Sequence, residues 1–316
     1  MKMKENNNIA ISVKNIKKTF TDKKVLKGVT IEVEKGTIHA LLGSNGAGKT
    51  TLIKVMTTLM KADSGEVKIN GYDVSIKACE AKQQFSVTGQ FSATDEALTG
   101  RQNLKIMGEL YHLKDVDMKI EQLLQAFDLK YAQNKVVSTY SGGMRRRLDI
   151  AMSIMCEPSI IFLDEPTTGL DPQNRSAMWN LIQSLAKAGT TIFLTTQYLE
   201  EAEVLADQIT ILNDGVIVKK GLPEELKKTL PQGIIELTFE QVQDVFSSKK
   251  LLHQFEQFDS PNTLSLILVT DGSMKQLASI FNTMNDANIT IVSFIQKLPT
   301  IEDVFYAIVK ESTKGA

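Results

Sequence analysis

The sequence predicts an α/β domain with a mixed sheet, followed by a small α+β domain, and three observations carry this prediction. Short apolar runs at 37–42, 159–166 and 190–196 are bounded by turn residues and separated by helical patterns, as in a parallel sheet. Alternating apolar residues near the start of the chain indicate antiparallel strands. A second group of alternating strands follows residue 228, so we expect domains at 1–228 and 229–316.

Length and composition agree with two soluble globular domains. A chain of 316 residues is too long for one ordinary core, and 42% hydrophobic and 23% charged residues are typical of soluble proteins. The formal net charge of −1 gives no reason to expect a nucleic-acid partner. Cys79 and Cys156 are too few and too far apart for a metal site or a disulfide framework, which favours a reducing cytosol.

The sequence predicts neither a targeting segment nor a membrane span. The N-terminal stretch MKMKENNN is polar and lacks the apolar segment of a signal peptide. The longest near-apolar tract, 148–163, is interrupted by Asp149, Glu157 and Pro158, so we expect no segment to span a bilayer. Any membrane role would therefore require a separate protein.

Apolar spacing predicts the elements of the first domain in order. Alternation at 9–13 and 29–33 predicts half-buried antiparallel strands, and 37–42 predicts a buried strand that runs into a glycine-rich turn. The remaining elements are a helix at 50–60, a strand at 66–74 with an Asn70-Gly71 turn, a mostly helical region at 93–135, and buried strands at 159–166 and 190–196.

The second domain is predicted to be small and without an active site. Alternation predicts strands around 235–239, 264–268 and 289–295, and a helix buries one face across 277–284. A final helix begins at Thr300, with Asp303 in the capping position. This part of the sequence holds no cluster of titratable groups that resembles an active site.

The stretch GSNGAGKT, residues 43–50, fits the phosphate-binding pattern G-x-x-x-x-G-K-[ST] between a predicted strand and a predicted helix. Its glycines let backbone N–H groups turn towards phosphate oxygens, and the helix start adds positive potential. Lys49 would place its charge on the β- and γ-phosphates, and the Thr50 hydroxyl would bind Mg²⁺. The flanking elements disfavour the alternative, a chance glycine-rich turn. The expected nucleotide-binding residues are Gly43, Ser44, Asn45, Gly46, Ala47, Gly48, Lys49, Thr50 and Thr51.

A pair of carboxylates follows the predicted strand in SIIFLDEP, residues 159–166. A phosphate-binding loop of this kind needs a carboxylate for its metal, and Asp164 would hold Mg²⁺ through water molecules. Glu165 would orient or deprotonate the attacking water. The alternative is that the pair only caps a helix, which is the weaker interpretation beside a phosphate-binding loop.

The stretch YSGGMRRRLDIAMSIM, residues 140–155, predicts a second anion site. Ser141, Gly142 and Gly143 open a helix whose free N–H groups, positive end and hydroxyl suit a phosphate. Since the first loop already covers one side of the phosphates, this site is best explained if it serves a nucleotide held by another copy. We therefore expect a head-to-tail homodimer about a two-fold axis. The arginines at 145–147 are expected to form a solvated helix face and not to bind the nucleotide.

These motifs and their order resemble the ATP-binding subunit of an ABC transporter over residues 10–222. The order is GSNGAGKT, Gln90, SGGMR, FLDEP, GLDP and TTQYLEEAE, and it is far more specific than any single motif. The tracts SVTGQFSATDEALTGRQNL, TTQYLEEAE and PTIEDVF are similar to the daunorubicin-resistance drug-exporter subfamily. The resemblance implies a P-loop NTPase fold of the ABC ATPase type, with a mixed sheet core, an antiparallel β subdomain and a helical subdomain. It also implies that the C-terminal domain is accessory and helps the ATPase subunits pair.

The resemblance implies roles for three further residues. Phe20 would stack on adenine, and Asp171 in GLDP would contact the opposite subunit. Gln90 would reach the metal and the attacking water and would sense the membrane partner. The alternatives are a core aromatic for Phe20, an exposed loop amide for Gln90 and a helix cap for Asp171.

Gln197 stands where most of the wider family has a histidine that hydrogen-bonds the γ-phosphate, and the resembled subfamily often has the same amide. An amide can donate to a phosphate oxygen but cannot carry a proton or a charge. A neutral hydrogen bond contributes about 0.5–1.5 kcal/mol net, against about 1.5–3 kcal/mol with a charged partner. We therefore expect Gln197 to tune turnover, with Lys49, Mg²⁺ and Glu165 providing most of the charge stabilisation. The alternative is that Gln197 only caps the following helix.

The sequence thus predicts an ATP- and Mg²⁺-dependent ATPase subunit of an ABC exporter, peripheral on the cytoplasmic face of the cell membrane. It would drive a hydrophobic drug, antibiotic or lipid-like substrate through a separate polytopic permease, which would dock near Gln90 and 93–135. The alternative is a non-transport ABC ATPase acting on a soluble macromolecular complex, but its usual tandem halves, coiled-coil insertion or zinc cysteines are missing. A P-loop kinase would lack SGGMR and GLDP, and a non-enzymatic nucleotide-binding module would lack Lys49 or Glu165.

Overall fold

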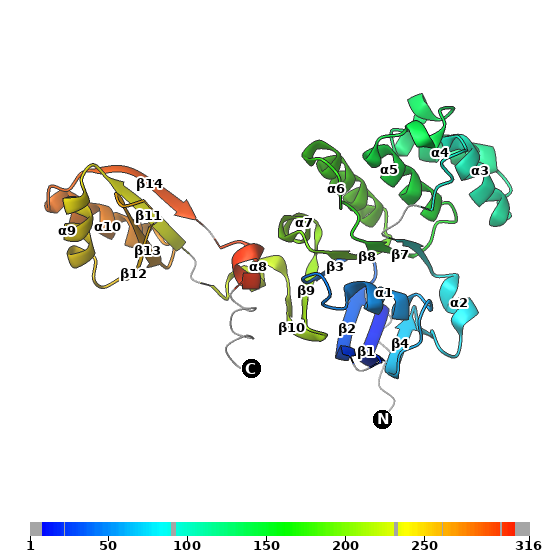
Figure 1. The fold of residues 1–316 in the computed structure, drawn as a ribbon, viewed down its shortest axis with the longest axis horizontal. Coiled ribbons are helices and arrows are strands. Elements are labelled where there is room, and N and C mark those ends of the chain that lie inside the picture. Colours follow the sequence, from blue (N-terminus) through cyan, green and yellow to red (C-terminus); the bar gives the residue numbers. More distant parts are fainter. Residues whose placement is uncertain are drawn as a thin grey trace. The chain divides into compact units, whose positions relative to one another are not determined.

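The protein forms two compact units, Met1–Leu222 and Pro223–Ala316 (Figure 1). The computed structural model describes residues 8–21, 23–89, 93–230, 233–260, 262–297 and 299–306. The division falls at the start of α8 (Pro223–Lys227), whereas the sequence prediction set the boundary after residue 228.

An antiparallel sheet forms the first part of the first unit. Its order is β2-β1-β4-β5, with bounds Lys23–Glu34, Ile9–Phe20, Ser64–Ile69 and Tyr72–Asp73. The alternation in the sequence determines the pairing, since Ile11 faces Val33 and Val13 faces Ile31, and all four side chains are buried. The predicted turn at 70–71 joins β4 to β5.

A six-stranded sheet forms the centre of the first unit. Its order is β10-β9-β3-β8-β7-β6, with bounds Val216–Gly221, Gln208–Asn213, Ile38–Leu42, Thr191–Thr196, Ile160–Asp164 and Phe85–Thr88. All neighbours pair in parallel except β10, which is antiparallel to β9. Strands β3, β7 and β8 are buried along their whole length, as their continuous apolar runs predict. The predicted mixed sheet is thereby confirmed.

Helices complete the first unit, and Figure 1 shows α3, α4, α5 and α6 grouped in the part coloured green. The predicted helix at 50–60 ends at Met56, because Thr58 has a φ of 63° that a right-handed helix cannot continue. The helices of this unit are α1 (Lys49–Met56), α2 (Ala78–Lys82), α3 (Gly100–Leu110), α4 (Val116–Ala126), α5 (Gly142–Ser153), α6 (Pro172–Lys187) and α7 (Leu199–Leu205), with 3₁₀ turns at Lys130–Ala132 and Val137–Thr139.

The second unit is a four-stranded antiparallel sheet with two helices. The strand order is β12-β13-β11-β14, with bounds Glu256–Asp259, Ser265–Thr270, Gly233–Phe239 and Ile291–Lys297. Helices α9 (Val242–Leu251) and α10 (Met274–Asp286) pack on one face in a single apolar cluster. Residues 301–306 are helical, and Asp303 exchanges hydrogen bonds with Thr300, as the capping prediction requires.

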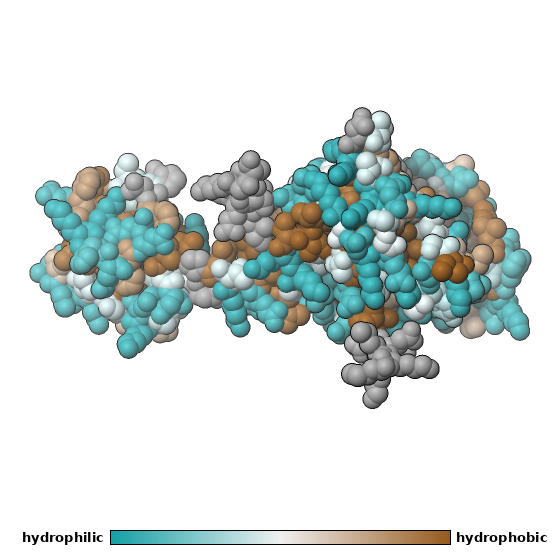
Figure 2. All heavy atoms as spheres, turned by 90° about the horizontal axis from the view of Figure 1, so that it is seen from below, coloured by the Kyte–Doolittle hydropathy of each residue, from teal (hydrophilic) through white to brown (hydrophobic). Residues whose placement is uncertain are grey.

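The described helices are all too short or too polar to cross a membrane. The face of the molecule in Figure 2 is largely hydrophilic, with hydrophobic side chains gathered in patches between the polar ones.

Candidate active site

The candidate site lies where three neighbouring strands of the central sheet end. Parallel pairing sets Leu42 of β3 beside Thr196 of β8, and Asp164 of β7 beside Thr195. The segments that follow these strands therefore converge at one edge of the sheet, although they are far apart in the sequence. In open α/β sheets, the carboxyl ends of the strands are where ligands bind.

The loop after β3 has the backbone that phosphate binding requires. Gly46 and Gly48 have φ angles of 82° and 110°, and Gly48 is the N-cap of α1. A Cβ atom at Gly48 would lie 3.0 Å from a Leu26 methyl carbon and 3.1 Å from the Val25 carbonyl oxygen. The N-cap has no side-chain hydrogen bond, so α1 presents its first N–H groups and the positive end of its dipole to this loop.

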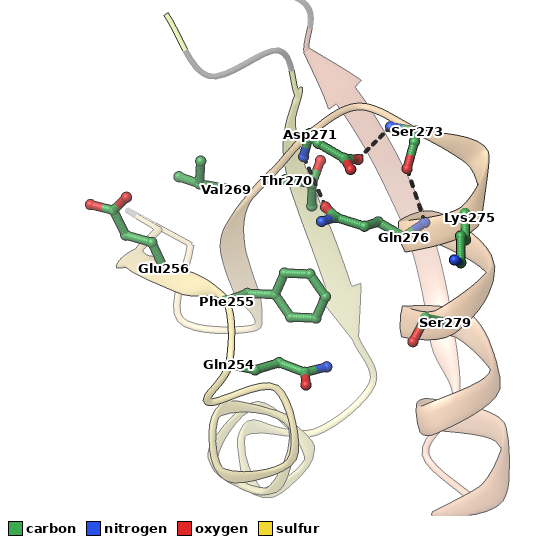
Figure 3. Close-up of a pocket in the computed structure, with 10 residues that line it drawn as sticks. All are labelled: Gln254, Phe255, Glu256, Val269, Thr270, Asp271, Ser273, Lys275, Gln276 and Ser279. Atoms are coloured by element: carbon green, nitrogen blue, oxygen red, sulfur yellow. Dashed lines mark hydrogen bonds between the residues drawn. The ribbon is translucent and has the colours of Figure 1, made fainter.

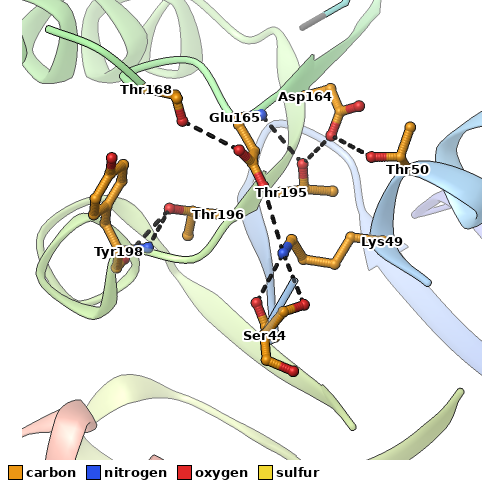
Figure 4. A network of polar contacts seen from close by, with 10 residues as sticks. Ser44, Lys49, Thr50, Asp164, Glu165, Thr168, Thr195, Thr196 and Tyr198 are labelled. Carbon is orange, nitrogen blue, oxygen red and sulfur yellow. Dashed lines mark hydrogen bonds and ion pairs between the residues drawn. The ribbon is translucent and has the colours of Figure 1, made fainter. Parts of the chain in front are cut away.

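Lys49 lies at the centre of this loop (Figure 4). Its Nζ donates to the Gly43 carbonyl oxygen at 2.8 Å and to the Ser44 carbonyl oxygen at 3.2 Å. The same nitrogen is 3.5 Å from Oε1 of Glu165. Burial lowers the pKa of the Lys49 ammonium, and the nearby Glu165 carboxylate acts in the opposite direction. The buried lysine therefore has a carboxylate partner within the site.

Thr50 and Asp164 provide oxygen atoms that fit a hard cation. Thr50 Oγ1 is 3.4 Å from Asp164 Oδ1, and Thr195 Oγ1 donates to the same carboxylate oxygen at 2.5 Å. Mg²⁺ is held by few protein oxygens together with water and substrate phosphates, and this hydroxyl–carboxylate pair matches that preference. No cluster of three or more His, Cys, Asp or Glu side chains forms a ready metal site within the described residues. A cation here would thus need phosphate and water oxygens as further ligands.

Glu165 follows Asp164 in an unusual backbone conformation. Its φ is 49°, in the left-handed region that side chains other than glycine seldom adopt. Its N–H donates to the Thr195 carbonyl oxygen at 3.1 Å and to Thr195 Oγ1 at 3.2 Å. Its Oε2 accepts from Thr168 Oγ1 at 3.2 Å. The carboxylate is therefore aimed between Lys49 and Thr168 (Figure 4).

A cavity of about 480 Å³ is lined by Lys49, Thr50 and Glu165, and its volume is in the usual range for a small-ligand site. Gln197 lines this cavity together with Asn45, Lys49 and Glu165. Tyr198 is the N-cap of α7, so Gln197 precedes the cap and does not occupy the capping position. The other lining residues are Lys23, Val25, Gly46, Gly48, Thr50, Thr51 and Thr168.

Ser141, Gly142 and Gly143 are not among the residues that line this cavity. Ser141 is the N-cap of α5, and its hydroxyl accepts from the Met144 N–H at 3.3 Å. Asp171 caps α6, accepting from the Asn174 N–H at 2.9 Å, and this backbone hydrogen bond is the main cause of its lowered pKa. Within one chain, Asp171 is thus a helix cap, the alternative that the sequence left open.

Phe20 does not contribute to the lining of this cavity. Phe20 ends β1 with 42% of its surface exposed, and Lys18 Nζ lies 5.7 Å from the centre of its ring. It is not a core aromatic, and it does not line the cavity. Gln90 lies outside the described residues.

The arginine run departs from the expected solvated helix face. Arg146 is 9% exposed and Arg147 is partly buried, and both donate to backbone carbonyl oxygens. Arg145 is the most exposed of the three but is still partly buried, and it forms an ion pair with Glu96 at 2.8 Å and donates to the Tyr140 carbonyl oxygen at 3.2 Å. A signal for Arg146 was present in the sequence, because Asp149 stands three residues later on the same helix.

A second cavity lies in the C-terminal unit, between β12, β13 and the start of α10 (Figure 3). Its polar groups bond one another: Ser273 Oγ accepts from the Gln276 N–H, and Gln276 Oε1 accepts from the Asp271 N–H. These hydrogen bonds cap the start of α10, so the polar groups of this cavity already have partners within the chain.

Comparisons with known proteins agree with the geometry of the first unit. A family model described as ABC transporter matches residues 26–168. Daunorubicin resistance ATP-binding protein DrrA3 of Streptomyces coeruleorubidus is 40% identical over 299 residues, which are 94% of this chain and 94% of that protein. Daunorubicin/doxorubicin resistance ATP-binding protein DrrA of Streptomyces peucetius is 36% identical, covering 95% and 92% of the two chains.

A solved structure of the ATP-binding subunit of an ABC transporter is 30% identical, with a TM-score of 0.63, covering 70% of this chain and 92% of that chain. The family model, the relatives and the solved structure all indicate the same family. The chain therefore belongs to the ABC transporter family and is one of its ATP-binding, ATP-hydrolysing subunits.

Proposed function

We propose that this protein drives export of a hydrophobic drug, antibiotic or lipid-like substrate through a separate polytopic permease. The observation that carries the proposal is the full-length match to two proteins named for daunorubicin resistance, which extends through the second unit. The protein would act as a peripheral subunit on the cytoplasmic face of the cell membrane. The permease would select the substrate.

The chemistry follows from the strand-end geometry. Lys49 would bind the β- and γ-phosphates, exchanging its loop carbonyl contacts for phosphate oxygens. Thr50 and Asp164 would hold Mg²⁺, which when bound neutralises charge on the phosphates. Glu165 would orient and deprotonate the attacking water, and Gln197 would donate one hydrogen bond to the γ-phosphate. Gln90 is proposed to complete this arrangement by reaching the metal and the water.

Two copies would be needed for a complete site. The start of α5 at Ser141 suits an anion, but within one chain it does not line the cavity around Lys49 where the phosphates would bind. Head-to-tail pairing would set Ser141, Gly142 and Gly143 of one copy on the nucleotide of the other. Exposed Asp171 would contact the partner, and exposed Phe20 would stack on adenine.

ATP binding would close such a pair, because both half-sites contribute affinity only in the closed form. Hydrolysis and release of phosphate would remove that differential affinity, and the pair would reopen. The movement would be passed to the permease.

The helical region of the first unit offers an apolar surface for the permease. Ile106, Leu110, Tyr111 and Met118 are 44%, 67%, 44% and 59% exposed on α3, α4 and the turn after α3. We infer that these side chains belong to the surface that the permease contacts.

The test is a Glu165→Gln variant, which should bind ATP, hydrolyse it at a small fraction of the normal rate, and accumulate as a closed dimer. Sedimentation velocity with and without Mg-ATP measures the dimer, and Lys49→Ala, which should bind ATP poorly, is the control. A Glu165→Gln variant that hydrolyses ATP at the normal rate would contradict the role of Glu165 as the base. A variant that stays monomeric with ATP would contradict the pairing. Copurification with a soluble complex, and not with a polytopic membrane protein, would contradict export.

A further inference from the structure

Arg146 of α5 connects three segments around the candidate active site. Its guanidinium donates to the Pro166 carbonyl oxygen at 3.0 Å and to the Asp164 carbonyl oxygen at 3.1 Å. A third hydrogen bond, 2.7 Å long, reaches the carbonyl oxygen of Gly89, which follows β6. The arginine guanidinium presents five N–H donors in a fixed plane, so it can satisfy several spread acceptors at once.

Asp149 completes this cluster from the next turn of α5. Its Oδ2 is 3.3 Å from Arg146 NH1, and both side chains are at most 10% exposed. Its Oδ1 accepts from the Ala93 N–H at 2.9 Å. The ion pair therefore binds Gly89 and Ala93, on either side of residues 90–92, to the same helix. A buried pair of this kind costs desolvation energy and adds little net stability, so stability alone does not account for it.

Two of the three backbone carbonyls that Arg146 binds belong to Asp164 and Pro166, the residues immediately before and after Glu165. That residue is held at a φ of 49°, a conformation that persists only when its surroundings impose it. Thr195 of β8 fixes the Glu165 N–H from one side. Arg146 fixes the two flanking carbonyl oxygens from the other side. The position of the Glu165 carboxylate thus depends on both contacts.

We propose that Arg146 is a positioning residue for Glu165, tying the turn that carries this carboxylate to helix α5. This inference rests on the catalytic role of Glu165 in the proposed function. Arg146 does not line the cavity around Lys49, so it acts on turnover through Glu165 and not on nucleotide binding. A misplacement of a reacting group by about 1 Å can lower a rate by about 10²-fold.

The experiment compares the full chain with the double variant Arg146→Met/Asp149→Leu. Removing both charges avoids an unpaired buried ion, and such replacements are often neutral for stability. The expected result is a folded protein with unchanged affinity for ATP, measured without Mg²⁺, and a kcat lowered by about 10- to 100-fold. Arg147→Met is the matched control, because Arg147 also donates to a backbone carbonyl and pairs with an aspartate, but its partners are Phe127 and Asp128 and not the residues beside Glu165.

Two further variants keep the proposal falsifiable. Arg146→Lys retains the charge but cannot reach three carbonyl oxygens, so its kcat should fall while its affinity for ATP holds. Adding Arg146→Met/Asp149→Leu to Glu165→Gln should lower the residual rate no further, since both act through one carboxylate. An unchanged kcat in the folded double variant, or an additive loss, would overturn the positioning role alone. A normal rate in Glu165→Gln would overturn the proposed catalytic role of Glu165 as well.

Discussion

Gln197 and His39, two polar residues of or next to the central sheet, lie in different environments. Gln197 follows β8 and lines the cavity beside Lys49 and Glu165. His39 lies within β3, fully buried, stacked on Phe193 with ring centres 5.5 Å apart and hydrogen-bonded to Thr210 at 2.9 Å. The first side chain is therefore available to a ligand, and the second belongs to the core.

For Gln197, we expect the alanine variant to lose about 2- to 10-fold in kcat, corresponding to one neutral hydrogen bond of about 0.5–1.5 kcal/mol. Gln197→His should retain or raise the rate, because a histidine can donate the same bond. Steady-state ATPase assays measure both. Gln243→Ala, on an exposed position of α9, is the control. A Gln197→Ala rate equal to that of the unmodified protein would show that the hydrogen bond is not made.

His39 predicts a pH-dependent stability. Burial lowers its pKa from 6.5 to about 3, so the folded protein keeps the ring neutral while the unfolded chain takes up a proton below pH 6.5. The contribution of the neutral His39 ring to the free energy of unfolding is fully present above pH 6.5 and is lost as the pH falls towards 3. Between pH 7.5 and 5.0 the protein should lose about 2 kcal/mol more unfolding free energy than His39→Gln. Urea titrations at both pH values measure the free energy of unfolding. If the unmodified protein and His39→Gln lose equal amounts, the pKa of His39 is not lowered and the prediction is wrong.

Helices α5 and α6 meet at their first turns, where a glycine of one faces the cap of the other. A Cβ atom at Gly143 would lie 2.5 Å from Asn174 Oδ1, whereas one at Gly142 would meet only Leu170, at 4.0 Å. Asn174 is hydrogen-bonded to Asp171 through both its backbone and its side chain. The close approach of α5 therefore depends on the absence of a side chain at Gly143.

Gly143→Ala should lower the free energy of unfolding by about 1–3 kcal/mol, because the added methyl forces Asn174 out of its contact with Asp171. Gly142→Ala is the matched control and should change stability by less than about 0.5 kcal/mol. Chemical denaturation without nucleotide measures both, so a phosphate-binding role does not enter. Equal effects of the two alanines would mean that the helices can separate freely here.

Spacing in the sequence predicted many of the elements whose burial is strongly periodic or continuous, but it did not predict β9, which is buried at 209–212, or β10. The buried strands β3, β7 and β8 and the loop at 43–50 were predicted because apolar runs and glycines mark them directly. The prediction did not include α9 and β12, since α9 buries only Val245 and Ser248 and has a weak apolar stripe. The buried state of Arg146 was missed because, apart from Asp149 three residues later, its partners are backbone carbonyls, which no side-chain pattern reveals.

At the scale of the whole molecule, motif order carried more information than any single element. The second unit has an apolar cluster of its own, drawn from its sheet and from α9 and α10. Its strands were largely predictable from alternation, but the role in pairing that the resemblance implies would depend on surface contacts, which periodicity does not encode. The composite site is proposed to form between two copies. It could be predicted only from the anion-binding helix start at Ser141 and not from the geometry of one chain.

The order of the central strands also has a consequence for synthesis on the ribosome. Strand β8 lies between β3 and β7 but follows both in the sequence. A nascent chain that has released β3 and β7 still lacks the strand that joins them, together with Thr195, which anchors Asp164 and Glu165. Translation must therefore proceed beyond Thr196 before the nucleotide cradle can assemble, and until then these apolar edges need shielding by chaperones or by the ribosome surface.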